Sequence, residues 1–262
     1  MRRAAAKRRR QVRRPRQGEL ALVRDKNGQR RGGRRPGAGR PPKIPGRSGS
    51  RHQRRPEVDP RHPQHVTLRV VGDIGHLRTA HKYRAIRAAL AASAASPTNA
   101  ACDDFRIVHF SVQGDHLHLI CEAASREALW RGVRAFEIAA ARNLNVERSR
   151  ELRRRRRGQV FADRYHARAL RSVREVRNAL AYVLNNWRHH PRSNRGPSLF
   201  DGRLDPYSSA ILFAGFAERT RPVHIPDGFE APAVVRPRSW LLAEGWKRAR
   251  AISVWEVPGP AG

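Results

Sequence analysis

Three early segments of the chain alternate apolar and polar residues with the two-residue period of a β-strand. Successive side chains of a strand point to opposite faces, so each segment would bury one face. The segments are residues 65–71, 105–112 and 116–122. The last two are joined by a short turn through Gly114 and Asp115, and a connection of that length predicts an antiparallel hairpin.

Three other segments repeat apolar residues every three or four positions, which is the period of an amphipathic helix. The first extends from His76 to about Ala94, the second begins near Ser125 and the third follows Ser172. Ser172 has Glu175 three residues later, the spacing of a capping box at a helix start. The residues predicted to face the core are Tyr83, Ile86 and Leu90, then Leu129, Val133, Phe136, Ala140 and Leu144, and finally Val176, Leu180, Val183 and Trp187.

A fourth strand is predicted at residues 158–170, after a run of arginines at 153–157 that we interpret as a solvated loop or a phosphate contact. The order is then strand, helix, strand, strand, helix, strand, helix. This order predicts an α+β fold, a ferredoxin-like antiparallel sheet with helices packed on one face. Residues 61–216 would form this domain, and residues 217–262 a partly irregular C-terminal extension.

The charge of the chain indicates its partner. It holds 55 Lys and Arg against 22 Asp and Glu, a net charge of +33, which favours a polyanion such as nucleic acid. Residues 1–60 are predicted to be a disordered basic tail, because they carry many charges and few aliphatic residues. Within this tail Arg34, Arg35 and Arg40 lie in a segment that loosely resembles an AT-hook, and we expect them to contact DNA phosphates or a minor groove.

Membrane and secreted classes are disfavoured. No apolar run approaches the roughly 20 residues of a spanning helix, and Met1 is followed by arginines instead of an apolar signal segment. The two cysteines, Cys102 and Cys121, are too few for a disulfide framework. We therefore expect a cytoplasmic protein associated with the nucleoid.

His116 and His118 are candidate metal ligands. They lie two residues apart in a predicted strand and therefore share one face. Neutral imidazole binds divalent cations, and a strand holds two rings in a fixed relation. Two ordinary surface histidines of a half-exposed strand would show the same spacing, so the pair alone leaves both interpretations open.

Tyr182 and Asn186 are one helical turn apart on a stripe beside the apolar face of the third helix. We therefore expect them at the edge of the interface between helix and sheet, with their polar ends exposed. A tyrosine in this position can also be a packing residue with its hydroxyl at the surface.

Together these motifs resemble a known family. The His116-Leu117-His118 strand, the segment 161–168 and the Tyr182–Asn186 spacing are similar to HUH single-tyrosine transposases of the IS200 type, especially the REP-associated branch. The resemblance covers about residues 65–216. It differs at one point, because REP-associated members usually have Asn-Pro and IS200 enzymes Gln where this chain has Asn186 followed by tryptophan.

The resemblance implies an activity and a site. It implies cleavage of single-stranded or hairpin DNA through a 5′-phosphotyrosine, with Tyr182 as nucleophile. His116, His118 and Asn186 would bind Mg²⁺ or Mn²⁺. Members of the family act as dimers that exchange tyrosine helices or as monomers, so a homodimer stays open. The DNA-facing surface would include Arg164, Tyr165, His166 and Arg168, where Tyr165 is a rival nucleophile.

Other interpretations stay open at this point. A non-catalytic nucleic-acid-binding protein that retains the fold would use the basic tail as its main contact. A basic protein associated with RNA or the ribosome would explain the charge, but not the histidine pair or the Tyr–Asn spacing. The general base is also open, with Glu175, His166 and His189 as candidates.

Overall fold

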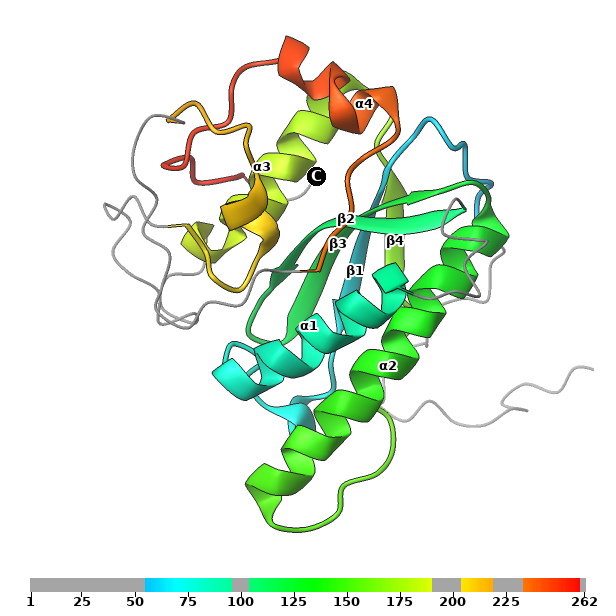
Figure 1. Cartoon of the computed structure of the whole chain (residues 1–262), viewed down its shortest axis with the longest axis vertical. Helices are drawn as coiled ribbons and strands as arrows, with labels where there is room; N and C mark the ends of the chain where they lie inside the picture. The colour runs from blue at the N-terminus through cyan, green and yellow to red at the C-terminus, as the bar shows by residue number, and fades with distance from the viewer. Residues whose placement is uncertain (1–54, 96–103, 190–203, 219–232, 260–262) are drawn as a thin grey trace, which may run out of the picture. The chain divides into compact units, whose positions relative to one another are not determined.

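A four-stranded antiparallel sheet forms the centre of the fold (Figure 1). The computed structural model describes residues 55–95, 104–189, 204–218 and 233–259. The strand order is β2-β3-β1-β4, so β3 and β1 are central. The strands are β1 Gln64–Arg69, β2 Phe105–Val112, β3 His116–Ala123 and β4 His166–Ala169.

The chain divides into two compact units, Met1–Arg51 and His52–Gly262, and every described residue belongs to the second unit. The predicted basic tail, with Arg34, Arg35 and Arg40, lies almost entirely outside the described residues. No helix in the described ranges is long and apolar enough to cross a membrane.

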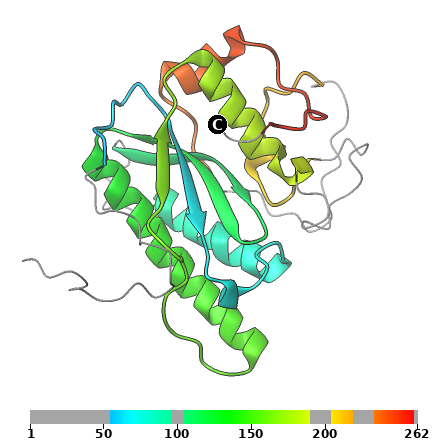
Figure 2. The same ribbon diagram turned by 180° about the vertical axis from the view of Figure 1, so that it is seen from behind.

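The predicted α+β fold with its antiparallel sheet and packed helices is confirmed, and two layers of helix flank the sheet. Helices α1 and α2 pack together on one face, and Figure 2 shows the sheet from the side opposite to them. Leu117 and Leu119 of β3 belong to the core under these two helices, whereas Ile120 belongs to a second core with α3. The prediction had all helices on one face, and α3 lies on the other. The helices are α1 Ala80–Ala95, α2 Arg126–Leu152 and α3 Val173–His189.

Local signals position the starts of α2 and α3 as the sequence predicts. The Ser125 side chain accepts a hydrogen bond from the Ala128 amide and caps α2. Before α3, the Ser172 hydroxyl accepts from the Glu175 amide at 3.2 Å. The Glu175 carboxylate accepts from the amide of Arg171 and not from that of Ser172, so the reciprocal half of the capping box is displaced by one residue.

Two predicted boundaries are wrong for a tertiary reason. Helix α1 begins at Ala80 and not at His76, because Gly72–Ile74 forms a 3-10 helix and the Leu77 amide donates to the Gly114 carbonyl. Of residues 158–170, only His166–Ala169 form a ladder with β1. The ladder stops because its register changes: continued from the Thr67–His166 pair it would place Asp163 opposite Val70, whereas the observed bridge joins Val70 to Phe161.

The C-terminal part of the chain covers α3. The short helix α4, Trp240–Ala243, and the 3-10 helix η5, Gly245–Arg248, place Leu242 and Trp246 in the core that α3 shares with the sheet. The buried Arg177 of α3 forms an ion pair with Glu256 and donates to the carbonyls of Arg250 and Ala251. These contacts fix the C-terminal segment beside the helix that carries Tyr182.

Candidate active site

His116 and His118 converge as their spacing predicts. Both extend from β3 on the face that α3 partly covers, and their Nε2 atoms are 3.0 Å apart. Two imidazole nitrogens bound to one cation at ~2.1 Å each, at about a right angle, would be separated by about 3 Å. The pair therefore has the separation of two ligands of a single ion.

The hydrogen bonds of the two Nδ1 atoms indicate which ring nitrogens of His116 and His118 could bind a cation. Asp115 Oδ1 is 2.6 Å from His116 Nδ1 and can only accept a hydrogen bond when ionised. Burial opposes ionisation of Asp115, but the hydrogen bond with His116 and the charge of Arg69 lower its pKa below the usual value. His116 therefore carries its proton on Nδ1, and its Nε2 lone pair points toward His118.

His118 is held in the same way by strand β1. Its Nδ1 lies 3.2 Å from Thr67 Oγ1 and 3.2 Å from His65 Nε2. Burial lowers the pKa of His65 to about 4, with Arg168 and His166 contributing, so His65 is neutral at pH 7 and its Nε2 can accept from His118. The tautomer pair in which both Nδ1 atoms donate would leave the two Nε2 lone pairs facing each other, the arrangement in which one cation can bind both rings.

Tyr182 of α3 contacts this pair directly. Its ring centroid is 5.0 Å from that of His118 and 5.9 Å from that of His65, edge to face in both cases. The residue is partly exposed, and burial of the phenol raises its pKa while a polar interaction with Asn186 lowers it. The hydroxyl is therefore protonated at neutral pH, and the same chain supplies both the phenol and the imidazoles.

Asn186 does not have the exposure that the sequence predicted. It is completely buried, and neither amide atom has a hydrogen bond of regular geometry. A buried amide without partners costs roughly 1–3 kcal/mol, so the position is unfavourable unless the amide acquires a ligand. Within the described ranges no three His, Cys, Asp or Glu side chains are grouped as a metal site, and among these residues the Asn186 amide is a candidate third donor of another type.

The residues predicted to face DNA are divided between the two sides of the sheet. His166 pairs with Thr67 and Arg168 with His65 across the β1–β4 ladder, so both lie on the face of the histidine pair, and both are exposed. Arg164 is exposed in the connection before β4.

Tyr165 is the exception, and its assignment to the surface is wrong. Its ring is buried in the core beneath α1 and α2, the guanidinium of Arg55 lies 3.4 Å from the ring centroid, and burial raises the pKa of the hydroxyl. Among the residues that the structure describes, the buried hydroxyl has no hydrogen bond of regular geometry. Tyr165 is therefore far less accessible to a phosphate than Tyr182.

The general-base candidates differ in their surroundings. The Glu175 carboxylate accepts from the Arg171 amide and lies 3.5 Å from Arg168, so it is engaged in positioning the start of α3. His166 is exposed on β4, and the side chain of His189 lies outside the described residues.

Sequence reasoning did not single out His65, Thr67 or Asp115. A signal for the first two was present, because His65 and Thr67 share the polar face of their strand with Arg69. The alternation could not show that these residues pair with the strand of His118. That depends on the register of β1 against β3.

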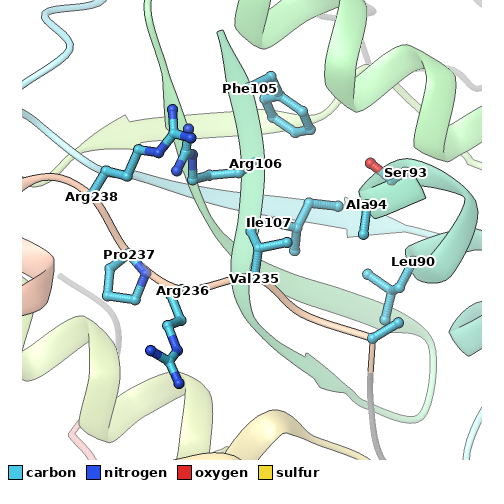
Figure 3. A pocket seen from close by; sticks show the side chains of 11 residues that line it. Leu90, Ser93, Ala94, Phe105, Arg106, Ile107, Val235, Arg236, Pro237 and Arg238 are labelled. Atoms are coloured by element: carbon cyan, nitrogen blue, oxygen red, sulfur yellow. The ribbon is translucent and has the colours of Figure 1, made fainter. Parts of the chain in front are cut away.

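Two cavities differ in their relation to this site. One of about 460 Å³ lies beside Tyr182 and His65 and is bordered by Arg168 and by Glu256 of the C-terminal segment. Another, of about 330 Å³, lies between α1, the edge strand β2 and residues 233–238 (Figure 3). Its apolar lining includes Leu90 and Ile107, which belong to the core on the opposite face of the sheet. The second cavity is therefore not part of the histidine–tyrosine site.

Part of the chain is similar to a known protein family. Residues 78–186 match the family model described as IS200-like transposase, a span that includes both histidines, Tyr182 and Asn186. A solved structure of a REP-associated tyrosine transposase bound to a REP hairpin is similar over 71% of this chain and 98% of its own length, with 16% sequence identity and a TM-score of 0.43. No curated protein sequence matches the chain significantly.

Proposed function

We propose that this chain, whose residues 78–186 match the IS200-like transposase family, is a metal-dependent single-tyrosine endonuclease and strand transferase of single-stranded or hairpin DNA. One observation carries the proposal. The Tyr182 ring contacts His118 at a centroid distance of 5.0 Å, and the Nε2 of His118 converges with that of His116. A nucleophile and a pair of cation ligands thus meet on the same face of the sheet.

The reaction begins with attack of the Tyr182 oxygen on the phosphorus of a DNA phosphodiester. The new bond joins the phenolic oxygen to phosphorus, the bond from phosphorus to the 3′ oxygen breaks, and that oxygen takes up a proton to become a free 3′-OH. The phenolic proton leaves to solvent or to a base. The phosphotyrosine keeps a phosphodiester bond, so a later attack by a 3′-OH joins strands without ATP.

His116, His118 and the Asn186 amide are the residues that would hold a divalent cation, Mg²⁺ or Mn²⁺. Bound there, such an ion supplies Lewis-acid stabilisation of charge on the non-bridging phosphate oxygens. The chain's own contribution is orientation. Asp115 holds His116 at 2.6 Å, while His65 and Thr67 hold His118, so both rings are fixed before any ligand arrives.

Two further features support the proposal. The DNA strand can approach across the exposed part of the sheet, where His166 and Arg168 flank the site with polar and charged groups. Tyr182 reaches the imidazoles of its own chain, so the proposed site is complete without exchange of helices in a dimer.

The test is incubation of end-labelled hairpin DNA, extended by a single strand, with Mn²⁺ and either wild type or Tyr182→Phe. We expect wild type to yield a protein–DNA adduct stable to SDS and a free 3′-OH end, and Tyr182→Phe to yield neither. Tyr165→Phe is the matched control, because it removes the rival hydroxyl, and it should cleave normally. Equal products from wild type and Tyr182→Phe would refute the assignment.

A non-catalytic DNA-binding protein that has kept the fold is the second candidate. It is favoured by the complete burial of Asn186, because the sequence had predicted this amide to be exposed toward the site as the third ligand. Such a protein should bind DNA equally well in EDTA and after His116→Ala, with no adduct under any condition. The proposed enzyme forms the adduct with Mn²⁺ and loses it in both tests.

A further inference from the structure

The five arginines between α2 and β4, Arg153–Arg157, form a loop that the proposed chemistry does not use. We name this segment the arginine loop. Four of the five residues are exposed, all except Arg156. The side chains of Arg153, Arg155 and Arg157 make no hydrogen bond or ion pair within the part of the chain that the structure describes, so their charges are not neutralised by the protein.

The conformation of the arginine loop is fixed by the fold. Arg153 has φ 49°, in the left-handed region that non-glycine residues rarely adopt, and it ends α2. The Arg154 amide donates to the Ser149 carbonyl at 3.2 Å, and the Arg156 amide donates to the Ser149 hydroxyl at 2.8 Å. An ordered loop presents its charges without the entropy loss that a flexible tail would incur on binding.

Arg156 anchors the arginine loop to neighbouring parts of the fold. The guanidinium of Arg156 donates to Asp73 at 2.7 Å and to the Gln159 carbonyl at 2.9 Å, and it also bonds Asn145. Arg156 lowers the pKa of Asp73 through this hydrogen bond, and the charges of Arg148 and Arg154 add to the effect. The loop is thereby attached to the 3-10 helix Gly72–Ile74, while its other guanidinium groups extend into solvent.

This attachment places the arginine loop at the end of the sheet where the histidine pair begins. The Val71 amide donates to Val160, just after the loop, and the Val70 amide donates to Asp115, which precedes His116. Figures 1 and 2 both show the segment after α2 at the same end of the molecule as the 3-10 helix. A groove of about 520 Å³ opens there, bordered by Arg69, Gly72, Gly114 and His116 among others.

We infer that the arginine loop binds the phosphate backbone of double-stranded DNA, the stem of a hairpin whose single-stranded extension passes the groove to Tyr182. Duplex DNA carries twice the phosphate charge of a single strand per unit length, so clustered guanidinium groups gain most from it. Binding of unpaired bases usually uses aromatic stacking, and residues 149–160 contain no aromatic side chain. The inference rests on the proposed function only in taking DNA as the ligand.

The experiment measures equilibrium binding by fluorescence anisotropy, using full-length Tyr182→Phe protein in EDTA so that no cleavage occurs. The test variant adds Arg153→Gln, Arg155→Gln and Arg157→Gln and keeps Arg156. The control variant instead adds Arg84→Gln, Arg131→Gln and Arg142→Gln, three exposed arginines on the helices that cover the opposite face. Both variants lose three charges and retain the basic N-terminal segment.

For a hairpin, we expect the test variant to bind roughly 10- to 100-fold more weakly at 0.15 M salt, and the slope of log K against log salt to decrease by about 2.7. The control variant should change both quantities little, and a single-stranded oligonucleotide of equal length should show a much smaller loss with the test variant. A second version with Arg153, Arg155 and Arg157 changed to Lys should restore most of the slope, since lysine also contacts phosphate.

Three results would overturn the inference: an equal loss in test and control variants, no loss in either, or an equal loss on hairpin and single strand. Circular dichroism of each variant shows whether the fold is retained, and the lysine version tests the same positions with their charge intact. Because the measurement needs no cleavage, failure of the Tyr182→Phe cleavage test would refute the enzyme and leave this result standing.

Discussion

The two faces of the sheet are made from alternate residues of the same strands, and they have opposite properties. Beneath α1 and α2, β3 contributes Leu117, Leu119 and Cys121, all completely buried among apolar neighbours. Toward α3 the same strand contributes His116 and His118, one partly exposed and both hydrogen-bonded to other polar groups. The two-residue period of a strand thus lets one segment stabilise the fold with one face and build a site with the other.

The contrast between the two faces predicts which substitutions should affect stability and which should affect the chemistry of the site. The face beneath α1 and α2 buries mainly aliphatic and aromatic side chains, whereas the α3 face holds imidazoles, a phenol and a buried amide. We expect a change on the first face to alter the free energy of unfolding, and a change on the second to alter metal dependence, pH dependence or cleavage.

The largest expected effect is on the apolar face. Phe136 of α2 is completely buried, and Phe136→Ala should lower the free energy of unfolding by about 3–5 kcal/mol through lost burial and a residual cavity. Urea denaturation measures this, and cleavage per folded molecule should be unchanged. Ile138→Ala, at an exposed position of the same helix, should cost far less. If Phe136→Ala impaired cleavage without loss of stability, the division between the faces would be wrong.

Low pH should reduce the free energy of unfolding through His109, which lies on the α3 face of the sheet. Burial lowers the pKa of His109 to about 4, and its ring contacts Ser209 and Phe213. His109 of the unfolded chain takes up a proton near pH 6.5, whereas buried His109 of the folded chain does so only near pH 4. The contribution of His109 to the free energy of unfolding is therefore fully present above pH 6.5 and is lost as the pH falls to 4. The loss is about 3 kcal/mol, at roughly 1.4 kcal/mol per pH unit. His109→Gln should reduce that slope by one proton in urea titrations at several pH values. An unchanged slope would contradict a neutral His109 in the folded state.

Metal addition should stabilise only a protein with an intact histidine pair. Mn²⁺ at a concentration 100 times its dissociation constant should raise the free energy of unfolding by about 2.7 kcal/mol, and EDTA should reverse the change. Thermal denaturation with and without Mn²⁺ measures the effect. His118→Ala should abolish the stabilisation, because it removes one of the two converging nitrogens. Equal stabilisation of His118→Ala would place the ion elsewhere.

The smallest expected effect on the free energy of unfolding comes from substituting Asn186, and the adjacent Asn185 is its control. Asn186 is buried with its amide unpaired, whereas the buried Asn185 donates to the Ser253 carbonyl at 2.9 Å. Asn186→Leu should raise the free energy of unfolding of the metal-free protein by about 1 kcal/mol and reduce Mn²⁺ affinity. Asn185→Leu should instead lower the free energy of unfolding, since it leaves a carbonyl without its donor. If Asn186→Leu also destabilised the protein, the polar interaction of its amide with Tyr182 would outweigh the cost of burying that amide.

Most of the fold could be predicted from the sequence, because it depends on local periodicity. The hairpin strands at 105–112 and 116–122 agree with β2 and β3 to within one residue, and every predicted core residue of α2 is buried. The fourth strand was predicted too long. Alternation within 158–170 could not indicate that the register against β1 changes before His166, so that only His166–Ala169 form a ladder.

The site was predictable only in part. By itself the sequence placed His116 and His118 on one face and Tyr182 one turn before Asn186, because those relations follow from the 2.0 and 3.6 residue periods of a single element. Tertiary structure alone brought Tyr182 against His118, put His65 and Thr67 behind that ring, and buried Asn186 and Tyr165. Strand register and the face that α3 covers are set by packing between segments far apart in sequence, and periodicity within one element carries no information about them.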